Sequence, residues 1–177
     1  MPESRRHPNV VNIDEVAPDE QAQGHFAFRR RRLGPAAGGK TVGCSYFELA
    51  PGKTAFPFHF HSAFEEALFV LEGTGTLRVG KDTVALRSGD YVGLPVGPET
   101  AHALTNSGAG LLRYLAFSAS AIPMTLDIVA YPDSKKYAFA AGVDPAKGLR
   151  SGWMMKVVKE DQANAGYYDD EPLAQKE

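Results

Sequence analysis

The sequence has very little cysteine and tryptophan, with one residue of each among 177. A single cysteine excludes an internal disulfide, so the fold must rest on packing and hydrogen bonds. Long apolar runs are also missing, and none approaches the roughly 18 residues that a membrane-spanning helix needs. The opening segment Met-Pro-Glu-Ser-Arg-Arg lacks the apolar stretch of a signal peptide. These absences predict a cytoplasmic protein with no membrane partner.

An excess of either charge is missing as well, because 19 basic and 21 acidic residues give a formal net charge of −2. Such a balance argues against nucleic acid as the main partner. The run Arg29 to Arg32 is basic, but its alternate members would be solvated along a strand or a sheet edge. The charge balance therefore predicts no nucleic-acid partner.

The chain does contain the regularly spaced turn residues that are typical of an all-β domain. Short apolar runs alternate with turn residues such as Gly80-Lys-Asp82 and Ser88-Gly-Asp90. Strand-like runs cover residues 43–49, 66–72, 75–79, 83–86, 91–94, 102–105 and 111–117. Strands repeated at this spacing are typical of a sandwich or a barrel. With 44% hydrophobic residues the chain can bury the core of one such domain.

Two histidines one residue apart are the most informative local feature. In Pro57-Phe58-His59-Phe60-His61, side chains 59 and 61 point to the same side of an extended segment, so both imidazoles can reach one ion. Glu66 has the opposite parity and reaches that side only if the chain turns or bulges within residues 62–65.

A third histidine, His102, comes from a separate cluster, and the four side chains together suit a divalent transition metal. Imidazole nitrogen and carboxylate oxygen are compatible with Fe, Mn, Ni, Co, Cu or Zn. A six-coordinate ion would keep two open positions, whereas a tetrahedral zinc site would be filled. Ligand imidazoles must be neutral, so bound metal is expected to fall as the pH drops below about 6.

The same residues resemble the first motif of the cupins, which is a Gly followed by H-x-H, four residues, Glu, six residues and Gly. Its positions are taken by Gly52, His59, His61, Glu66 and Gly73, with one extra residue between Gly52 and His59. The insertion lengthens a loop and leaves the ligand positions in place.

The second cupin motif, a Gly, five residues, P-x-G, a short spacer, His, three residues and Asn, is matched by Gly89, Pro95, Gly97, His102 and Asn106. The spacer has four residues where two are commonest. Together the motifs cover about half of the chain, and it resembles a small single-domain (type 2) cupin.

This resemblance implies a jelly-roll β-barrel, also called a double-stranded β-helix. It places an N-terminal arm and leading strand at residues 1–39, the barrel at 40–120 and a C-terminal extension at 121–177. The first 24 residues are expected to be ordered only where they dock. In the extension, residues 152–158 could form a strand or a short helix.

Cupins include dioxygenases, isomerases, epimerases, decarboxylases and lyases, and the fold does not choose among them. The predicted function is a metal-dependent enzyme on a small organic substrate, with dioxygenase-type chemistry favoured because Phe56 and Phe64 suit an apolar pocket. The alternatives are a sugar or sugar-phosphate isomerase or epimerase, and a module that binds a ligand or metal without turnover.

No unambiguous general acid or base accompanies the predicted ligands. Glu65 should point away from them by parity, and Tyr46 lies in a neighbouring strand. Glu99 is the best candidate, because it lies in the lengthened loop before His102 and a loop can swing a carboxylate over the barrel mouth.

Strand parity also makes a prediction about assembly. If His59 and Glu66 face inward, then Phe58, Phe60 and Phe69 face outward, so these strands are apolar on both faces. A strand of this kind is normally covered on both sides. Either the terminal segments of the same chain or a second subunit could provide the cover, and the sequence favours a two-fold homodimer.

Overall fold

The computed structural model describes residues 7–120, 126–142 and 154–161, and nearly all their regular structure is β-strand. The strands are β1 (Asp19–Gln23), β2 (Phe26–Arg32), β3 (Val42–Leu49), β4 (Phe60–His61), β5 (Phe64–Glu72), β6 (Thr74–Val79), β7 (Asp82–Arg87), β8 (Tyr91–Leu94), β9 (His102–Asn106), β10 (Leu112–Ser120), β11 (Leu126–Tyr131), β12 (Lys136–Ala141) and β13 (Met154–Lys159). The helical elements are α1 (Leu33–Ala36) and the short 3-10 turns η1 (Ile13–Glu15), η2 (Pro98–Thr100) and η3 (Pro132–Ser134). The all-β prediction is confirmed. Among the described residues, no helix has the length and apolar character to cross a membrane.

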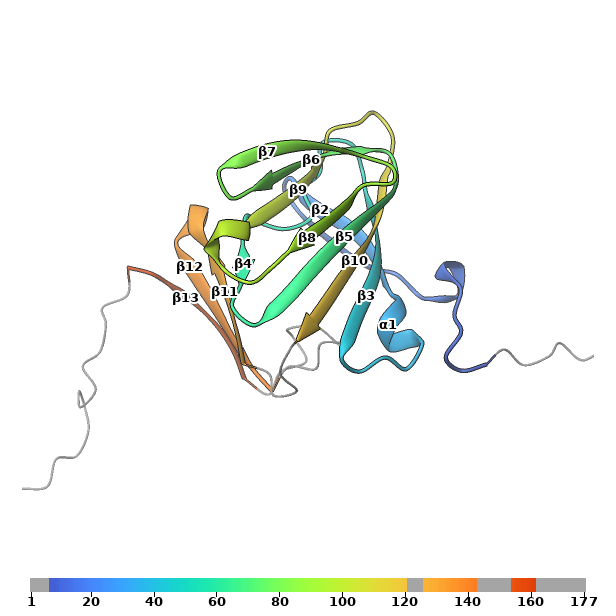
Figure 1. Cartoon of the computed structure of the whole chain (residues 1–177), viewed down its shortest axis with the longest axis horizontal. Coiled ribbons are helices and arrows are strands. Elements are labelled where there is room, and N and C mark those ends of the chain that lie inside the picture. Colours follow the sequence, from blue (N-terminus) through green and yellow to red (C-terminus); the bar gives the residue numbers. More distant parts are fainter. Residues whose placement is uncertain (1–6, 121–125, 143–153, 162–177) are drawn as a thin grey trace, which may run out of the picture.

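The strands form three sheets, and every pairing between named strands is antiparallel. The strand orders are β1-β2-β3-β10-β5-β8, β13-β12-β11-β4 and β7-β6-β9. Figure 1 shows β11, β12 and β13 beside the barrel, on the side of β4. Strands far apart in sequence are therefore neighbours, as a jelly roll requires, since β10 lies between β3 and β5.

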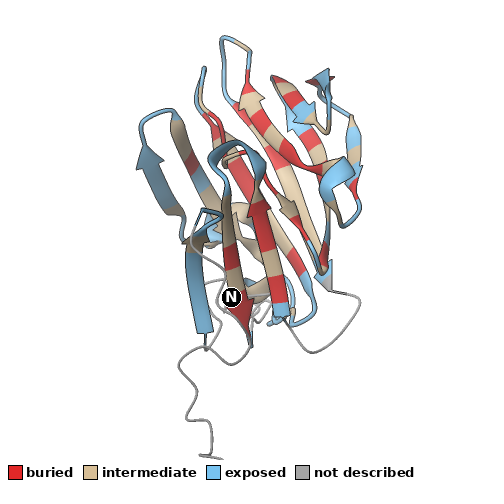
Figure 2. Ribbon diagram, turned by 90° about the vertical axis from the view of Figure 1, so that its left-hand side faces the viewer, coloured by how far each residue is buried: buried red, intermediate tan, exposed pale blue. Residues whose placement is uncertain are grey.

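Alternation along the central strands separates a buried inner face from an outer face. In β5, Leu68 and Val70 are buried, and in β3 the same holds for Phe47 and Leu49. Buried and less buried residues alternate along the strands in Figure 2. The core cluster consists of Phe28, Phe47, Leu49, Ala55, Leu68, Val70, Leu77, Leu86, Leu94, Leu104, Leu112 and Tyr114. This core cluster fills the barrel interior beside the histidines described below.

Both terminal segments contribute strands. β1 lies in the segment assigned to the N-terminal arm and pairs with β2 at the edge of the six-stranded sheet. Within residues 152–158, the described part belongs to β13, so a short helix is excluded there. The division at residues 39 and 120 stays a prediction.

The arginine run 29–32 belongs to β2 and is not simply solvated, which corrects the expectation from the sequence. The side chains of Arg30 and Arg31 are only 21% and 12% exposed. Arg30 pairs with Asp19, and Arg31 pairs with Glu48 on the adjacent strand. Cross-strand carboxylates explain how the sheet accommodates this run.

Candidate metal centre

Backbone pairing brings the two histidine clusters together. His59 and His102 form an antiparallel bridge in which each backbone N–H donates to the other residue's carbonyl, at 3.1 and 2.7 Å. His61 follows in β4, and its carbonyl oxygen accepts from the backbone N–H of Gly97 at 3.0 Å. The loop before His102 is thereby hydrogen-bonded to β4, so all three imidazoles come from one hydrogen-bonded region.

A tight turn between β4 and β5 puts the side chain of Glu66 on the same side as the imidazoles of His59 and His61. β4 ends at His61 and β5 begins at Phe64, so the parity changes across Ser62 and Ala63, as the sequence predicts. The backbone N–H groups of these two residues donate to Oδ1 of Asp127 in β11, at 3.2 and 3.1 Å. The buried carboxylate therefore holds the turn that returns the chain towards the histidines.

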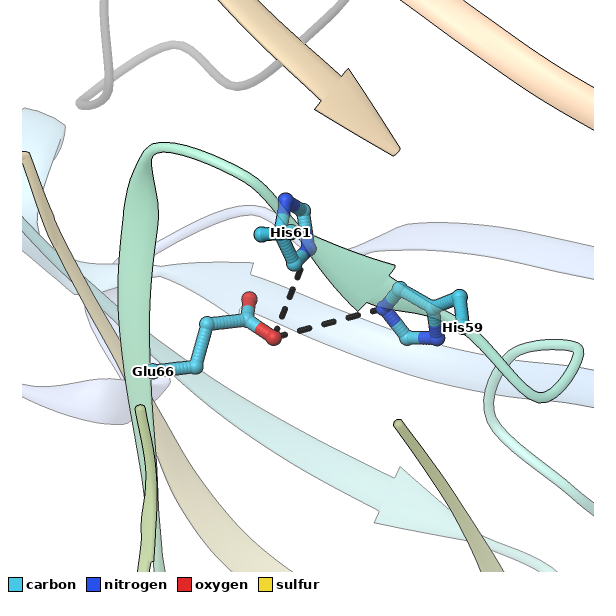
Figure 3. Close-up of side chains that lie close together, drawn as sticks. All are labelled: His59, His61 and Glu66. Atoms are coloured by element: carbon cyan, nitrogen blue, oxygen red, sulfur yellow. Dashed lines mark ion pairs between the residues drawn. The ribbon is translucent and has the colours of Figure 1, made fainter. Parts of the chain in front are cut away.

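The four predicted ligand side chains converge on one point. The Nε2 atoms of His59, His61 and His102 lie 4.0, 3.5 and 3.2 Å from the same oxygen, Oε2 of Glu66. Ligand atoms from His59, His61 and Glu66 all lie within 4.8 Å of one another. Figure 3 shows the two imidazoles facing the Glu66 carboxylate, with His59 just before β4, His61 at its end and Glu66 on β5.

In each of these three histidines, the Nδ1 atom forms a hydrogen bond with an acceptor outside the cluster. The partners of the Nδ1 atoms are the carbonyl oxygen of Pro57 for His59 at 2.8 Å, Oδ2 of Asp127 for His61 at 2.6 Å and the carbonyl oxygen of Thr100 for His102 at 3.0 Å. Since these partners are acceptors, each neutral imidazole carries its proton on Nδ1. The Nε2 lone pairs are then available on the side of Glu66, which is the tautomer that metal coordination needs.

Electrostatics favours a neutral His59 and an ionised Glu66, whereas it favours the protonated form of His61. Burial has the largest effect on His59 and, together with His102, lowers its pKa to about 4. Burial would raise the pKa of Glu66, but His61 and the hydrogen bond with His102 outweigh it and lower that pKa to about 2. Burial would likewise lower the pKa of His61, yet Glu66 and Asp127 outweigh it and raise the pKa. A neutral His59 beside an ionised Glu66 is ready to bind a cation.

The donor set fits a divalent transition metal. Three imidazole nitrogens and one carboxylate oxygen are borderline and hard donors, which suit the ions from Mn to Zn. The three histidines are buried, and the side chain of Glu66 is 24% exposed.

Aromatic rings surround the imidazoles. Phe56 and Tyr131 lie 6.0 Å from the ring of His59, and Phe64 lies 6.1 Å from that of His61. Burial is the main reason why the pKa of Tyr131 is raised, so its hydroxyl stays protonated near neutral pH. The surroundings are therefore largely apolar, with a phenol as a hydrogen-bond donor.

The structure places the three general-acid or general-base candidates differently. Glu99 is exposed in η2, and within the described part of the chain no hydrogen bond or ion pair joins it to the cluster. Glu65 is exposed at the start of β5. Tyr46 contacts Glu48, with its hydroxyl 3.5 Å from Oε1. The catalytic role of Glu99 stays a prediction.

Asp127 is the residue that reasoning from the sequence missed. It is fully buried and binds His61 and the adjacent turn, although it lies more than 60 residues further along the chain. The available signal was an acidic residue inside the apolar run Leu126-Asp-Ile-Val-Ala, because a buried carboxylate requires a partner. No short-range spacing connects it with the histidine motif.

Comparisons with known proteins agree with this geometry. Residues 45–118 match the family model described as a cupin domain. A solved structure of a candidate sugar phosphate isomerase from Acidithiobacillus ferrooxidans is 23% identical, with a TM-score of 0.73 over 89% of this chain and 96% of that one. A sugar phosphate isomerase of the cupin superfamily from Silicibacter pomeroyi is 18% identical, with a TM-score of 0.72 over 89% and 97%.

A more distant similarity covers a smaller share of the chain. A predicted oxalate decarboxylase from Thermotoga maritima is 21% identical, with a TM-score of 0.54 over 63% of this chain and 98% of that one. Comparison with curated protein sequences finds no match. The domain match and the agreement of both motifs lead to one assignment: residues 45–118 of this chain form a cupin domain.

Proposed function

We propose that this cupin is a metal-dependent isomerase acting on a small sugar or sugar phosphate. His59, His61, Glu66 and His102 would hold one divalent transition metal. The observation that carries the proposal is the convergence of three Nε2 atoms on one oxygen of Glu66. The convergence occurs in a chain whose fold is shared, over 89% of its length, with two proteins described as sugar phosphate isomerases.

These similarities support the isomerase alternative better than the dioxygenase interpretation that the sequence favoured. The likeness covers 89% of this chain, whereas that to the oxalate decarboxylase covers 63%. A likeness longer than the matched cupin domain is relevant here, because Asp127 and its strand β11 lie outside residues 45–118.

The metal ligands and the aromatic residues around them would have different roles in an isomerisation. A bound divalent metal supplies Lewis-acid polarisation of a substrate oxygen. The three buried imidazoles and Glu66 would hold that metal, and the protonated hydroxyl of Tyr131, whose ring lies beside that of His59, would donate a hydrogen bond to the substrate. Phe56 and Phe64 limit the access of water.

An aldose and its ketose differ by the transfer of one hydrogen between two adjacent carbons and of one proton between the oxygens on those carbons, so a base must take the carbon-bound proton and return it to the neighbouring carbon. We assign this role to Glu99, in the loop whose end carries His102. The Glu99→Gln variant should lose at least about 100-fold in kcat, within the usual contribution of a general base, and should keep its metal. Glu65→Gln serves as the control, because Glu65 is also an exposed glutamate. Unchanged kcat in Glu99→Gln would remove Glu99 from the mechanism.

Metal content tests the site independently of any substrate. Elemental analysis of the purified protein should find about one transition-metal ion per chain, and the His59→Ala, His102→Ala double variant should retain almost none. Stoichiometric metal in the folded double variant would overturn the ligand assignment.

Turnover tests the reaction. The metal-loaded protein should interconvert an aldose and a ketose, free or phosphorylated, without oxygen, and should exchange the proton on the carbon beside the carbonyl for solvent deuterium. NMR in deuterium oxide measures both. Binding of these compounds without exchange would instead favour a non-catalytic module.

An oxygen-dependent reaction is the second candidate. The observation in its favour is the apolar surround of Phe56 and Phe64 next to the imidazoles. Oxygen uptake by the iron-loaded protein with a catechol, diketone or thiol substrate would support it. Anaerobic turnover of a sugar with no oxygen uptake would decide for the isomerase.

A further inference from the structure

Tyr131 reaches the metal centre from the last position of β11. The backbone pairing of β11 with β4 ends at Ala130, which is opposite Phe60. Tyr131 is the next residue, and the turn η3 follows it. Its ring nevertheless lies beside that of His59, with centroids 6.0 Å apart and planes at 25°. The backbone ladder with β4 therefore stops just short of the phenol, and side-chain contacts of the turn become important for its position.

An ion pair joins this turn to β6. Nη1 and Nη2 of Arg78 donate to Oδ2 and Oδ1 of Asp133, at 2.6 and 3.0 Å. The two side chains are 47% and 54% exposed. Exposed ion pairs usually contribute little, but a bidentate pair between a guanidinium group and a carboxylate fixes both distance and direction. The turn is therefore held in a defined place against the barrel.

Arg78 also contacts the residue that precedes His59. Its guanidinium carbon lies 3.6 Å from the ring centroid of Phe58, which is buried. A cation over the face of an aromatic ring is attracted to it, and the attraction grows where water is excluded. On β6, Arg78 is opposite Ala103, the neighbour of His102. One side chain thus contacts both the segment that leads to His59 and the turn that follows Tyr131.

These contacts form a closed circuit around the ring pair of His59 and Tyr131. Phe58 and His59 are neighbours in the chain, and one residue separates Tyr131 from Asp133. Arg78 joins Phe58 to Asp133 and so completes the circuit. Removal of the guanidinium group would open the circuit at the point where the turn meets the barrel.

We propose that Arg78 and Asp133 are positioning residues, which hold the hydroxyl of Tyr131 in place for its hydrogen bond with the substrate. This inference rests on the proposed function for the role of Tyr131. The ion pair would act through the turn and would not contact the substrate. Metal binding should not depend on it, because Asp127, near the other end of β11, is held separately by the turn at Ser62.

The placement of Tyr131 can be measured without metal or substrate. In ¹⁹F NMR of the metal-free protein labelled with 3-fluorotyrosine, the Tyr131→Phe variant identifies the Tyr131 resonance by its loss. Arg78→Met should move this resonance towards that of an exposed tyrosine such as Tyr91. The matched control is Arg87→Met, which removes an exposed arginine of the adjacent β7 and should leave the resonance unchanged. An unchanged Tyr131 resonance in Arg78→Met would overturn the proposal.

Rescue variants separate the ion pair from general damage to the fold. Arg78→Asp should move the Tyr131 resonance, and the Arg78→Asp, Asp133→Arg double variant should return it towards the wild-type position. Arg78→Lys keeps the charge but not the bidentate geometry, so it should restore the resonance only in part. A double variant that behaves like Arg78→Asp would overturn the role of the ion pair.

Elemental analysis should find the wild-type metal content in all of these variants. Loss of metal from the folded Arg78→Met variant would overturn the assigned role, because the pair would then support the ligand set.

Kinetics measure the consequence for the reaction. Tyr131→Phe removes one hydrogen bond and should lower kcat by up to about 10-fold. Arg78→Met should lower kcat by a smaller factor and leave KM nearly unchanged. The Arg78→Met, Tyr131→Phe double variant should be no slower than Tyr131→Phe alone, since both changes remove the same interaction. Losses that multiply in the double variant would show that Arg78 does not act through Tyr131.

Failure of the positioning role and failure of the proposed function give different results. If the protein isomerises a sugar and Arg78→Met keeps the wild-type kcat, the function stands and the positioning role is wrong. If the Tyr131 resonance depends on Arg78 and Asp133 but no sugar is isomerised, the ion pair still places Tyr131 and the proposed function fails.

Discussion

Asp127 determines which nitrogen of His61 faces Glu66. Its Oδ2 lies 2.6 Å from His61 Nδ1, and its Oδ1 accepts from the turn at Ser62 and Ala63. A carboxylate has no proton to donate and only accepts hydrogen bonds. The imidazole must therefore be the donor, and its proton stays on Nδ1 of His61. Carboxylates in this position typically contribute 10- to 100-fold to metal affinity.

The Asp127→Asn variant should therefore bind metal about 10- to 100-fold more weakly than the wild type. The asparagine oxygen can still accept from the turn, but its amide can donate to Nδ1 and move the His61 proton to Nε2. Competition with a chromophoric chelator measures the affinity, and thermal unfolding shows that the fold is kept. Asp133→Asn is the control, because Asp133 is exposed and pairs with Arg78. Wild-type metal affinity in Asp127→Asn would contradict the role assigned to the carboxylate.

At the scale of the elements, Glu48 connects three strands. Oxygens of this β3 residue lie 3.0 Å from Arg31 Nη1 and 3.5 Å from Arg29 Nη1 in β2, and 3.3 Å from Arg113 Nε in β10. Burial would raise the pKa of Glu48, but hydrogen bonds from Arg31 and Arg113 outweigh it and lower the pKa below 4.5. The carboxylate is only 13% exposed, so screening by water is limited.

This lowered pKa predicts a loss of stability in acid. Because the folded pKa lies below the unfolded value, Glu48 stabilises the fold fully above pH 4.5, and the contribution is lost as the pH falls through the folded pKa. Glu48→Gln should cost about 1–3 kcal/mol at pH 7, and the gap to the wild type should narrow below pH 4.5. Urea unfolding between pH 7 and 3 measures the gap, with the exposed Glu65→Gln as control. A gap that is independent of pH would refute the ionic explanation.

The strands were easier to predict than the side chains between them. The predicted strand 91–94 coincides with β8, and 43–49 is one residue shorter than β3, because local alternation and turn residues define both. The parity of His59 and His61 also followed from local rules. Asp127 and the pairing of Arg30 with Asp19 depend on strands that meet only in the folded sheet, so periodicity gave no sign of them.

At the scale of the molecule, the outer face of the six-stranded sheet carries an apolar row. Tyr46, Leu115, Phe69 and Tyr91 are opposite one another across β3, β10, β5 and β8. Phe69 is on this outer face, as parity predicts, and Tyr91 is 68% exposed. Phe58 differs, because it is buried and the guanidinium carbon of Arg78 lies 3.6 Å from its ring centroid. It therefore offers no outer surface to a second subunit.

We propose a homodimer formed through this row, since two copies related by a two-fold axis would cover each other's apolar face. Light scattering should report about twice the 19.1 kDa chain mass. The Phe69→Lys, Tyr91→Lys double variant should run at the mass of one chain and keep its fold, whereas Val84→Lys, an exposed substitution in β7, should leave the mass unchanged. A monomeric wild type at micromolar concentration would end the dimer proposal.

The origin of Asp127 has a consequence for how this centre could be transplanted. All four proposed ligands lie within residues 45–118, the part that matches the cupin domain, yet the carboxylate behind His61 comes from β11. A graft limited to the matched segment would transfer the donor atoms without the group that orients one of them. The smallest portable version of this centre must include β11 and the strand partner, β12, that keeps it in place.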